Sequence, residues 1–269
     1  MKRITTFLAT AAMASMVSAQ TLSIKGSDTL GAKLIPQLAE AFKATGNKDI
    51  KFEIAAEGST TAFPALANGT AQIGMSSRKV KDDERTFCKT KGVYLEEHPI
   101  CHDMLCVIVN KNSPLTKLTQ DQVAKIFTGQ IKDWSEIGGA PGKISIYTRN
   151  TSSGTYKDWQ KIAMGGRDYP STSLKMAGNE QIAQEVAKNK NGIGYVGLAY
   201  SKTSGTKALP IDGVEPIAKN AKKYAFARLC YLYAPDKPSA EADAFMKFIE
   251  SAPGQEIVRK VGFIPVADL

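Results

Sequence analysis

Residues 144–156 read ISIYTRNTSSGTY, and this stretch indicates the fold class. The apolar run 144–147 predicts a buried strand, and the spacing of apolar residues over 156–163 predicts an amphipathic helix. A loop of small and hydroxyl residues, Ser152-Ser153-Gly154-Thr155, joins the two. A strand followed at once by a helix is the building unit of α/β proteins, so we expect an α/β fold.

Two more units of the same kind precede this one. Gly26-Ser27-Asp28-Thr29 lies between a predicted strand and a predicted helix, and so does Gly58-Ser59-Thr60-Thr61. The predicted strands are 22–24, 50–55, 72–75, 104–109, 144–147, 193–196 and 226–233. The predicted helices are 30–44, 61–67, 118–127, 156–163, 181–187 and 240–250.

The three loops share one chemistry. Each places a glycine and hydroxyl residues at the start of a helix, where free N–H groups and the helix dipole favour an anion. Such residues are also ordinary helix caps and turn residues, so a single loop would say little. Three of them, each at the carboxyl end of a strand, predict an anion site at the sheet edge. Arg149 stands four residues before Ser153, and its guanidinium offers two parallel donors to an oxyanion.

The net charge agrees with an anionic ligand. The chain has 35 Lys and Arg against 26 Asp and Glu, a formal charge of +9. Basic proteins attract nucleic acid, acidic lipid or small acids. No cluster of basic residues interleaved with aromatics is present in the sequence, and no nucleic-acid motif, so we expect no nucleic-acid partner.

The first residues predict export. Lys2 and Arg3 precede an apolar run of small residues, and Val17-Ser18-Ala19 fits a signal-peptidase site. We therefore expect residues 1–19 to be a cleaved signal peptide rather than a membrane anchor, since the run is short and interrupted. No cysteine follows the cleavage point, so we expect a periplasmic protein that is not a lipoprotein.

Four cysteines, Cys88, Cys101, Cys106 and Cys230, form an even set in an oxidising compartment. The runs around Cys106 and Cys230 predict two strands that could lie side by side. We predict the disulfides Cys106–Cys230 and Cys88–Cys101. A metal site built on Cys101 and His102 is a weaker alternative, because the spacing matches no common zinc pattern.

Motifs along most of the chain resemble the periplasmic phosphate-binding protein of phosphate ABC importers. The resemblance covers residues 22 to the C-terminus, and Arg149 with Ser153-Gly154-Thr155 is its most specific part. The other matching motifs are Gly26-Ser27-Asp28-Thr29-Leu30, Gly58-Ser59-Thr60-Thr61, Ile73-Gly74-Met75-Ser76-Ser77-Arg78, Leu118-Thr119, Ile126-Phe127-Thr128-Gly129, Trp134 and Gly192-Ile193-Gly194-Tyr195.

The resemblance implies a two-lobed clamshell of the type II periplasmic-binding-protein class, each lobe a mixed sheet flanked by helices. It implies a first lobe of residues 20–108 and 221–269 and a second of residues 109–220. Phosphate would bind between the lobes and favour their closed state. The ligand-binding residues implied by position are Ser27, Thr29, Leu30 through its N–H, Ser59, Ser77, Arg149, Ser153, Gly154 through its N–H, and Thr155.

One departure affects selectivity. Ser77 stands where known members of the family have an aspartate that accepts the proton of bound phosphate. A carboxylate at that place repels unprotonated sulfate, and a serine does not. Asp28 is a possible substitute acceptor, or it caps the helix that follows it. Sulfate, molybdate or tungstate are therefore the alternative cargoes.

Other function classes fit less well. A hydrolase or phosphatase would need a Gly-x-Ser-x-Gly elbow or a cluster of metal ligands, and the only histidines are His98 and His102. An adhesin on the same fold is the remaining alternative. We therefore expect a monomeric binding protein, not an enzyme, with no cofactor and no metal. Its partners would be inorganic phosphate and the membrane permease of an ABC importer.

Overall fold

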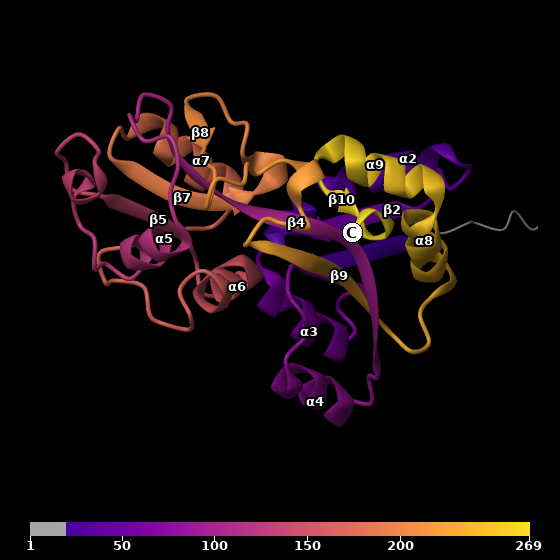
Figure 1. The fold of residues 1–269 in the computed structure, drawn as a ribbon. Coiled ribbons are helices and arrows are strands. Elements are labelled where there is room, and N and C mark those ends of the chain that lie inside the picture. Colours follow the sequence, from indigo (N-terminus) through magenta and orange to yellow (C-terminus); the bar gives the residue numbers. More distant parts are fainter. Residues whose placement is uncertain (1–19) are drawn as a thin grey trace, which may run out of the picture.

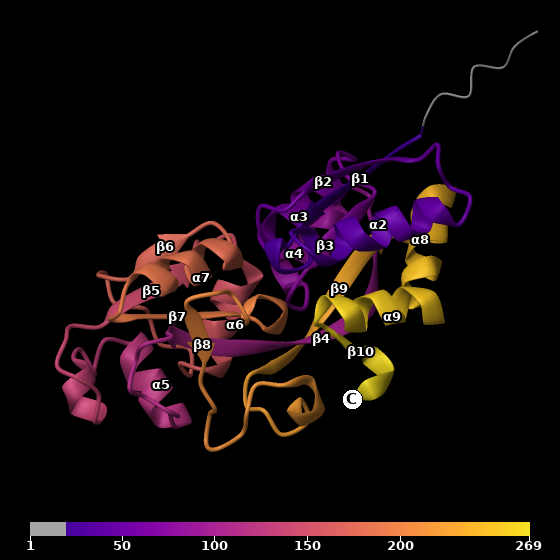
Figure 2. The same ribbon diagram turned by 90° about the horizontal axis from the view of Figure 1, so that it is seen from above.

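The computed structural model describes residues 20–269, so the predicted signal peptide lies outside the described residues. Figures 1 and 2 show two α/β lobes side by side, with the long strand β4 (Leu95–Asn110) passing from one into the other. The predicted α/β class and clamshell architecture are confirmed. Within residues 20–269, no helix is long and apolar enough to cross a membrane.

The first lobe is built on a mixed sheet. Its strands lie in the order β2, β1, β3, β9, β4, with β10 added beside β4. Its large core packs Phe42, Phe52 and Phe245 against one another between the sheet and its helices. The strands are β1 (Thr21–Gly26), β2 (Lys51–Ala55), β3 (Ile73–Ser76), β9 (Ala227–Pro235) and β10 (Ile264–Pro265). The helices are α1 (Asp28–Gly31), α2 (Leu34–Ala44), α3 (Ser59–Ala67), α4 (Asp82–Thr90), α8 (Ala240–Glu250) and α9 (Ala252–Val261).

The second lobe continues the sheet through the far half of β4, in the order β4, β7, β5, β6, with β8 also beside β4. Its core is centred on Trp159, which stacks on Tyr195 and contacts Phe127 and Phe226. The strands are β5 (Ser145–Arg149), β6 (Leu174–Met176), β7 (Gly192–Gly197) and β8 (Thr206–Ala208). The helices are α5 (Gln120–Phe127), α6 (Gly154–Ile162) and α7 (Asn179–Lys188), with short 3-10 turns at Trp134–Ile137, Leu198–Tyr200 and Ala218–Asn220. A further 3-10 turn, Val266–Asp268, follows β10 of the first lobe.

Strand β4 is the main connection between the lobes. It pairs with β9 from Leu95 to Met104 and with β7 from Leu105 to Val109. The predicted lobe boundary at 108/109 therefore falls inside this strand. The sequence predicted only its second half, because the first half contains Glu96, Glu97 and His98 and lacks a continuous apolar run.

Most other elements form where they were predicted. Helix α8 has the predicted bounds, and α3, α5, α6 and α7 lie within two residues of them. The predicted helix 30–44 is interrupted after Gly31, because the chain turns at Ala32 and Lys33 before α2 begins. Helices α4 and α9 were not predicted, since each is short and rich in charged or polar residues.

The cysteine pairings are corrected by the strand register. Strands β4 and β9 are antiparallel neighbours, as predicted, but the residue directly opposite Cys230 is Cys101. Cys106 lies five residues further along β4, about 17 Å away at ~3.4 Å per residue, so a Cys106–Cys230 bridge is wrong. Cys88 donates to the carbonyl of Phe63 in a separate core, and all four thiols are unbridged.

The register predicts a different bridge. Directly opposed residues in an antiparallel pair have Cα atoms about 4.5–5.5 Å apart, which suits a disulfide. Burial, with a hydrogen bond to Cys230, raises the pKa of the Cys101 thiol well above its ordinary value, so the folded protein should react slowly. After refolding with oxidised glutathione, we expect peptide mapping to find a Cys101–Cys230 bridge and free thiols at Cys88 and Cys106. A bridge from Cys106 or Cys88 would contradict this register.

The metal alternative is not supported. Successive residues in a strand point to opposite faces, so Cys101 and His102 cannot both face one ion. Cys101 points into the first core, and the partner of His98 is Glu250. Across residues 20–269, no group of three or more His, Cys, Asp or Glu side chains could hold a metal.

Candidate functional site

The three predicted loops meet between the lobes. Thr29 lies in the first turn of α1 in the first lobe and Thr155 in the first turn of α6 in the second, yet their hydroxyl oxygens are 2.9 Å apart. Ser59, at the start of α3, has its hydroxyl 3.3 Å from that of Ser77. All four side chains are buried. The first turns of three helices thus converge, and their leading N–H groups have no carbonyl within their own helix to bind.

The loops of the two lobes touch directly. The N–H and the hydroxyl of Thr60 both donate to the carbonyl of Ser152, at 3.1 and 2.9 Å. The hydroxyl of Ser152 donates to the carbonyl of Glu57 at 3.0 Å. A Cβ added to Gly154 would lie 2.7 Å from the Ser77 hydroxyl and closer still to that of Ser59. The structure is therefore a closed form in which the two lobes are in contact.

Arg149 lies at this junction with unused donors. It ends β5 and is 1% exposed, and its Nε donates to the carbonyl of Ala177 at 3.1 Å. Nη1 lies 3.1 Å from Asp28 Oδ2, but not in hydrogen-bond geometry, and among the described residues neither Nη1 nor Nη2 has a hydrogen-bond partner. Burial lowers the pKa of Arg149 from its usual value, although a guanidinium stays charged at any ordinary pH. Two such donors on a buried cation suit an oxyanion ligand.

Asp28 ties the lobes together. Its Oδ2 accepts from the backbone N–H of Asn179 at 3.0 Å and from the Asn179 side chain at 2.8 Å. It therefore satisfies the N-terminus of α7 in the other lobe, rather than a donor at the start of α1. The carboxylate also lies beside Arg149, so it is placed where an anion held by that guanidinium would be within reach.

The remaining predicted residues take different places. Ser153 is the N-cap of α6, and its hydroxyl oxygen accepts from the N–H of Tyr156 at 3.2 Å, which leaves its proton free to donate. The side chain of Leu30 packs in the first core, so only its backbone could contribute to the junction. Ser27 is buried, and its backbone N–H donates to the carbonyl of Met75.

Three residues at the junction were missed by sequence reasoning. Asn179 is fully buried and contacts Asp28 and Thr29, and Tyr200 donates to the carbonyl of Thr29 at 3.1 Å. Arg228 reaches both threonine hydroxyls from β9. Each lies outside the hydroxyl-rich loops, and no local motif marks it in the sequence.

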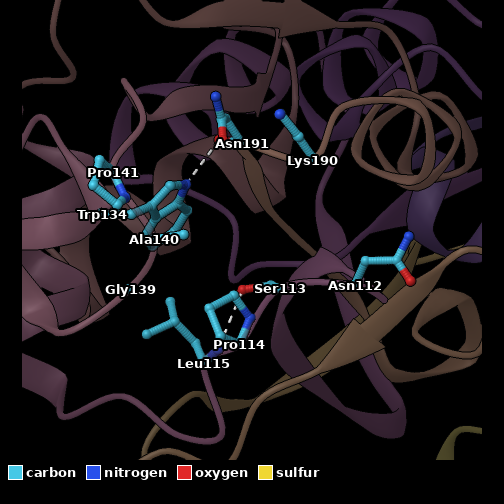
Figure 3. A pocket seen from close by; sticks show the side chains of 10 residues that line it. All are labelled: Asn112, Ser113, Pro114, Leu115, Trp134, Gly139, Ala140, Pro141, Lys190 and Asn191. Carbon is cyan, nitrogen blue, oxygen red and sulfur yellow. Dashed lines mark hydrogen bonds between the residues drawn. The ribbon is translucent and has the colours of Figure 1, made fainter.

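The junction is distinct from the pockets of the surface. Figure 3 shows a pocket of the second lobe, whose lining includes Trp134, Pro114 and Pro141. Its volume is about 110 Å³. The Trp134 indole donates to the carbonyl of Asn191 there, at 3.2 Å. The pocket has Lys190 as its one charged lining residue, and it contains none of the converging loop residues. The buried junction is therefore the candidate functional site.

Comparison with known proteins agrees with this geometry. Residues 12–253 match the family model described as a PBP superfamily domain. The chain is 35% identical to the phosphate-binding protein PstS of Pseudomonas aeruginosa, over 91% of this chain and 83% of that protein. It is 31% identical to PstS of Bacillus subtilis, over 92% of this chain and 81% of that protein.

Solved structures give the same result. One is a protein from Clostridium perfringens, described as a phosphate ABC transporter substrate-binding protein and solved with bound phosphate. Its TM-score to this structure is 0.84 and its sequence identity is 33%, and the match covers 92% of this chain and 100% of that one. An ABC-type phosphate transport receptor from Vibrio cholerae has a TM-score of 0.73 and a sequence identity of 25%. That match covers 90% of this chain and 99% of the receptor. The fold and site thus define a substrate-binding protein of the PBP superfamily. Within it, the chain belongs to the family of the phosphate-binding proteins PstS.

Gly154 gives a direct test of the junction. Because its added Cβ would occupy the space between the Ser59 and Ser77 hydroxyls, we expect Gly154→Ala to hold the lobes apart. Overpacking costs about 1–3 kcal/mol, so anion affinity should fall about tenfold or more in a calorimetric titration. Gly165→Ala is the control: a Cβ there meets nothing within 4 Å, and the strain of an alanine at its φ of +61° should lower stability without changing anion affinity. Equal affinities of the two variants would contradict the placement of Gly154.

Proposed function

We propose that this protein binds inorganic phosphate between its lobes and delivers it to the membrane permease of an ABC importer. The observation that carries the proposal is Arg149, a buried guanidinium at the meeting point of three helix N-termini, with two nitrogens that have no hydrogen-bond partner in the described part of the chain. A tetrahedral oxyanion fits both the paired donors and the surrounding hydroxyls. The names of the relatives at 31–35% identity support phosphate as the anion.

The ligand-binding residues come from both lobes. Thr29, Ser59 and the Leu30 N–H would bind one side of the anion, and the residues of the second lobe the other. Those residues are Arg149, Ser153, Thr155 and the Gly154 N–H. The hydroxyls of Ser77 and Ser27 would also line the anion site. Because only the closed arrangement brings both sets together, phosphate binding favours closure. The predicted lobe division, 20–108 with 221–269 and 109–220, remains part of this proposal.

Asp28 is our proposed acceptor for the phosphate proton. Its carboxylate lies beside Arg149, whereas Ser77 carries no charge. Since Oδ2 is held by Asn179, Oδ1 is the oxygen available to the ligand. A carboxylate in this place accepts from a protonated phosphate and repels a bare sulfate oxygen.

Asp28→Asn tests selectivity. We expect the variant to lose phosphate affinity and gain sulfate affinity, so that the preference falls by about tenfold or more, as for the loss of a charge-assisted hydrogen bond. Competition titrations with phosphate and sulfate at two pH values measure the preference. An unchanged preference would leave Asp28 only as the cap of α7.

The rest of the proposal concerns cellular context. The mature protein would be a periplasmic monomer, exported by the signal peptide predicted at residues 1–19 and not lipid-anchored. It would be a carrier rather than an enzyme, since the site offers donors and a guanidinium but no nucleophile with a base. The relatives named above are binding proteins, which favours this reading.

The deciding experiment is a calorimetric titration of the anion-stripped mature protein. Phosphate, sulfate and molybdate would be added separately at neutral pH. Tight one-to-one phosphate binding without a sulfate response is the expected result. Binding of sulfate or molybdate instead would change the cargo and keep the clamshell, and no binding of any of the three would overturn the proposed function.

A further inference from the structure

Arg228 is a buried arginine of β9 that contacts residues of both lobes. Its side chain is 6% exposed, and Nη2 and Nε lie 2.9 and 3.3 Å from Asp103 Oδ2. Nη1 lies 3.3 Å from Asp158 Oδ2. Asp103 belongs to β4, where the strand crosses between the lobes, and Asp158 belongs to α6 of the second lobe. Arg228 therefore joins the crossing strand to the helix that begins at Gly154.

The same guanidinium reaches the two threonines of the site. Nη2 donates to Thr155 Oγ1 at 2.9 Å and lies 3.4 Å from Thr29 Oγ1. These two hydroxyl oxygens are also 2.9 Å from each other. Thr29 comes from the first lobe and Thr155 from the second, so all three groups meet only when the lobes are closed.

This contact determines what the hydroxyls can do. A hydroxyl has one proton to donate, and it can accept with its lone pairs. A guanidinium only donates, so Thr155 must accept from Arg228 and keep its own proton for another partner. One of the two hydroxyl protons can form the hydrogen bond between Thr29 and Thr155. The other then has no acceptor in this group, and it is available to a ligand oxygen.

We propose that Arg228 is a positioning residue that orients the free hydroxyl proton of the Thr29–Thr155 pair toward the bound oxyanion. The inference rests on the proposed function, because it concerns donors to the same anion. Arg228 acts through the hydroxyls, whereas Arg149 binds the anion itself. Asp103 and Asp158 fix the guanidinium from two sides, so its direction toward the threonines is set by the closed fold.

The first test is a double-mutant cycle on phosphate affinity. Hydrogen bonds to charged groups are worth about 1.5–3 kcal/mol, so Arg228→Met should weaken phosphate binding about 10- to 100-fold. Thr155→Val should weaken it by a similar factor in the native background. In the Arg228→Met background the Thr155→Val loss should shrink to about threefold or less, because the hydroxyl is no longer directed. A merely structural role of Arg228 would give independent, multiplicative losses and would overturn the inference.

Two further variants keep the test clear. Arg228→Met leaves Asp103 buried without its partner, so the pair Arg228→Met with Asp103→Asn removes both charges and is used if the single variant does not fold. Arg259→Met is the matched control, because that arginine is exposed and pairs only with Glu256 and Asp268. It should bind phosphate as the native protein does.

The outcomes separate the two proposals. A native protein that binds no phosphate would overturn the proposed function. A native protein that binds phosphate, while Arg228→Met binds it equally well, would overturn only the role of Arg228. Native binding with a strongly reduced Thr155→Val effect in the Arg228→Met background would support both.

Discussion

Replacing Arg149 with alanine is expected to reduce phosphate affinity more than any other single change in the site. The guanidinium is buried, and its Nη1 and Nη2 have no hydrogen-bond partner among residues 20–269. The surrounding groups are hydroxyls and N–H donors, apart from the charged side chains of Asp28 and Arg228. Truncating one partner of a buried charged contact costs about 2–5 kcal/mol, or about 30-fold to several thousandfold in affinity. Calorimetric titration of the native and variant proteins measures this loss.

The variant must stay folded for the result to count. Asp28 keeps its two hydrogen bonds from Asn179 when Arg149 is removed, so we expect thermal unfolding in phosphate-free buffer to remain cooperative. Added phosphate should then raise the unfolding temperature of the native protein but not of Arg149→Ala. Arg149→Lys should be intermediate, because an ammonium keeps the charge without the paired donors. A folded Arg149→Ala protein with native affinity would refute the site.

Trp159→Ala is expected to cause the largest loss of stability. Trp159 is fully buried, and its ring lies 4.4 Å from that of Tyr195, 5.0 Å from Phe226 and 5.1 Å from Phe127. Replacing a buried tryptophan by alanine costs about 3–5 kcal/mol, from lost burial and from the cavity left behind. Urea unfolding followed by circular dichroism measures the difference in the free energy of unfolding.

Trp159→Phe serves as the matched variant, because it keeps an aromatic ring in the same space and should lose less stability. The remaining tryptophan, Trp134, lies in the same lobe and reports its unfolding by fluorescence. A loss below about 1 kcal/mol in Trp159→Ala would show that the second core does not depend on this ring. Because Trp159 lies on α6, which begins at Gly154, a loosened core should also weaken phosphate binding.

The positions of the elements were largely predictable because they depend on local patterns. Apolar runs marked seven strands, and the 3.6-residue spacing marked α8 and the helices of the second lobe. Short elements escaped because their apolar faces are small: α4 consists largely of charged and polar residues, and β6 has only three residues. The first half of β4 escaped for a different reason. Its charged residues lie on a strand that is held by pairing with β9, not by its own apolar pattern.

Local sequence patterns were sufficient to predict the α/β class, the three hydroxyl loops and the arginine at the end of β5, because each depends on residues close together in the chain. The meeting of distant residues depends on the three-dimensional fold. It placed Cys101, not Cys106, opposite Cys230, since register is set by the pairing of whole strands. It brought Asn179 and Arg228 to the threonine hydroxyls, and it joined Asp28 to a helix 151 residues away. Such contacts follow from how the two lobes close, which no local pattern of residues encodes.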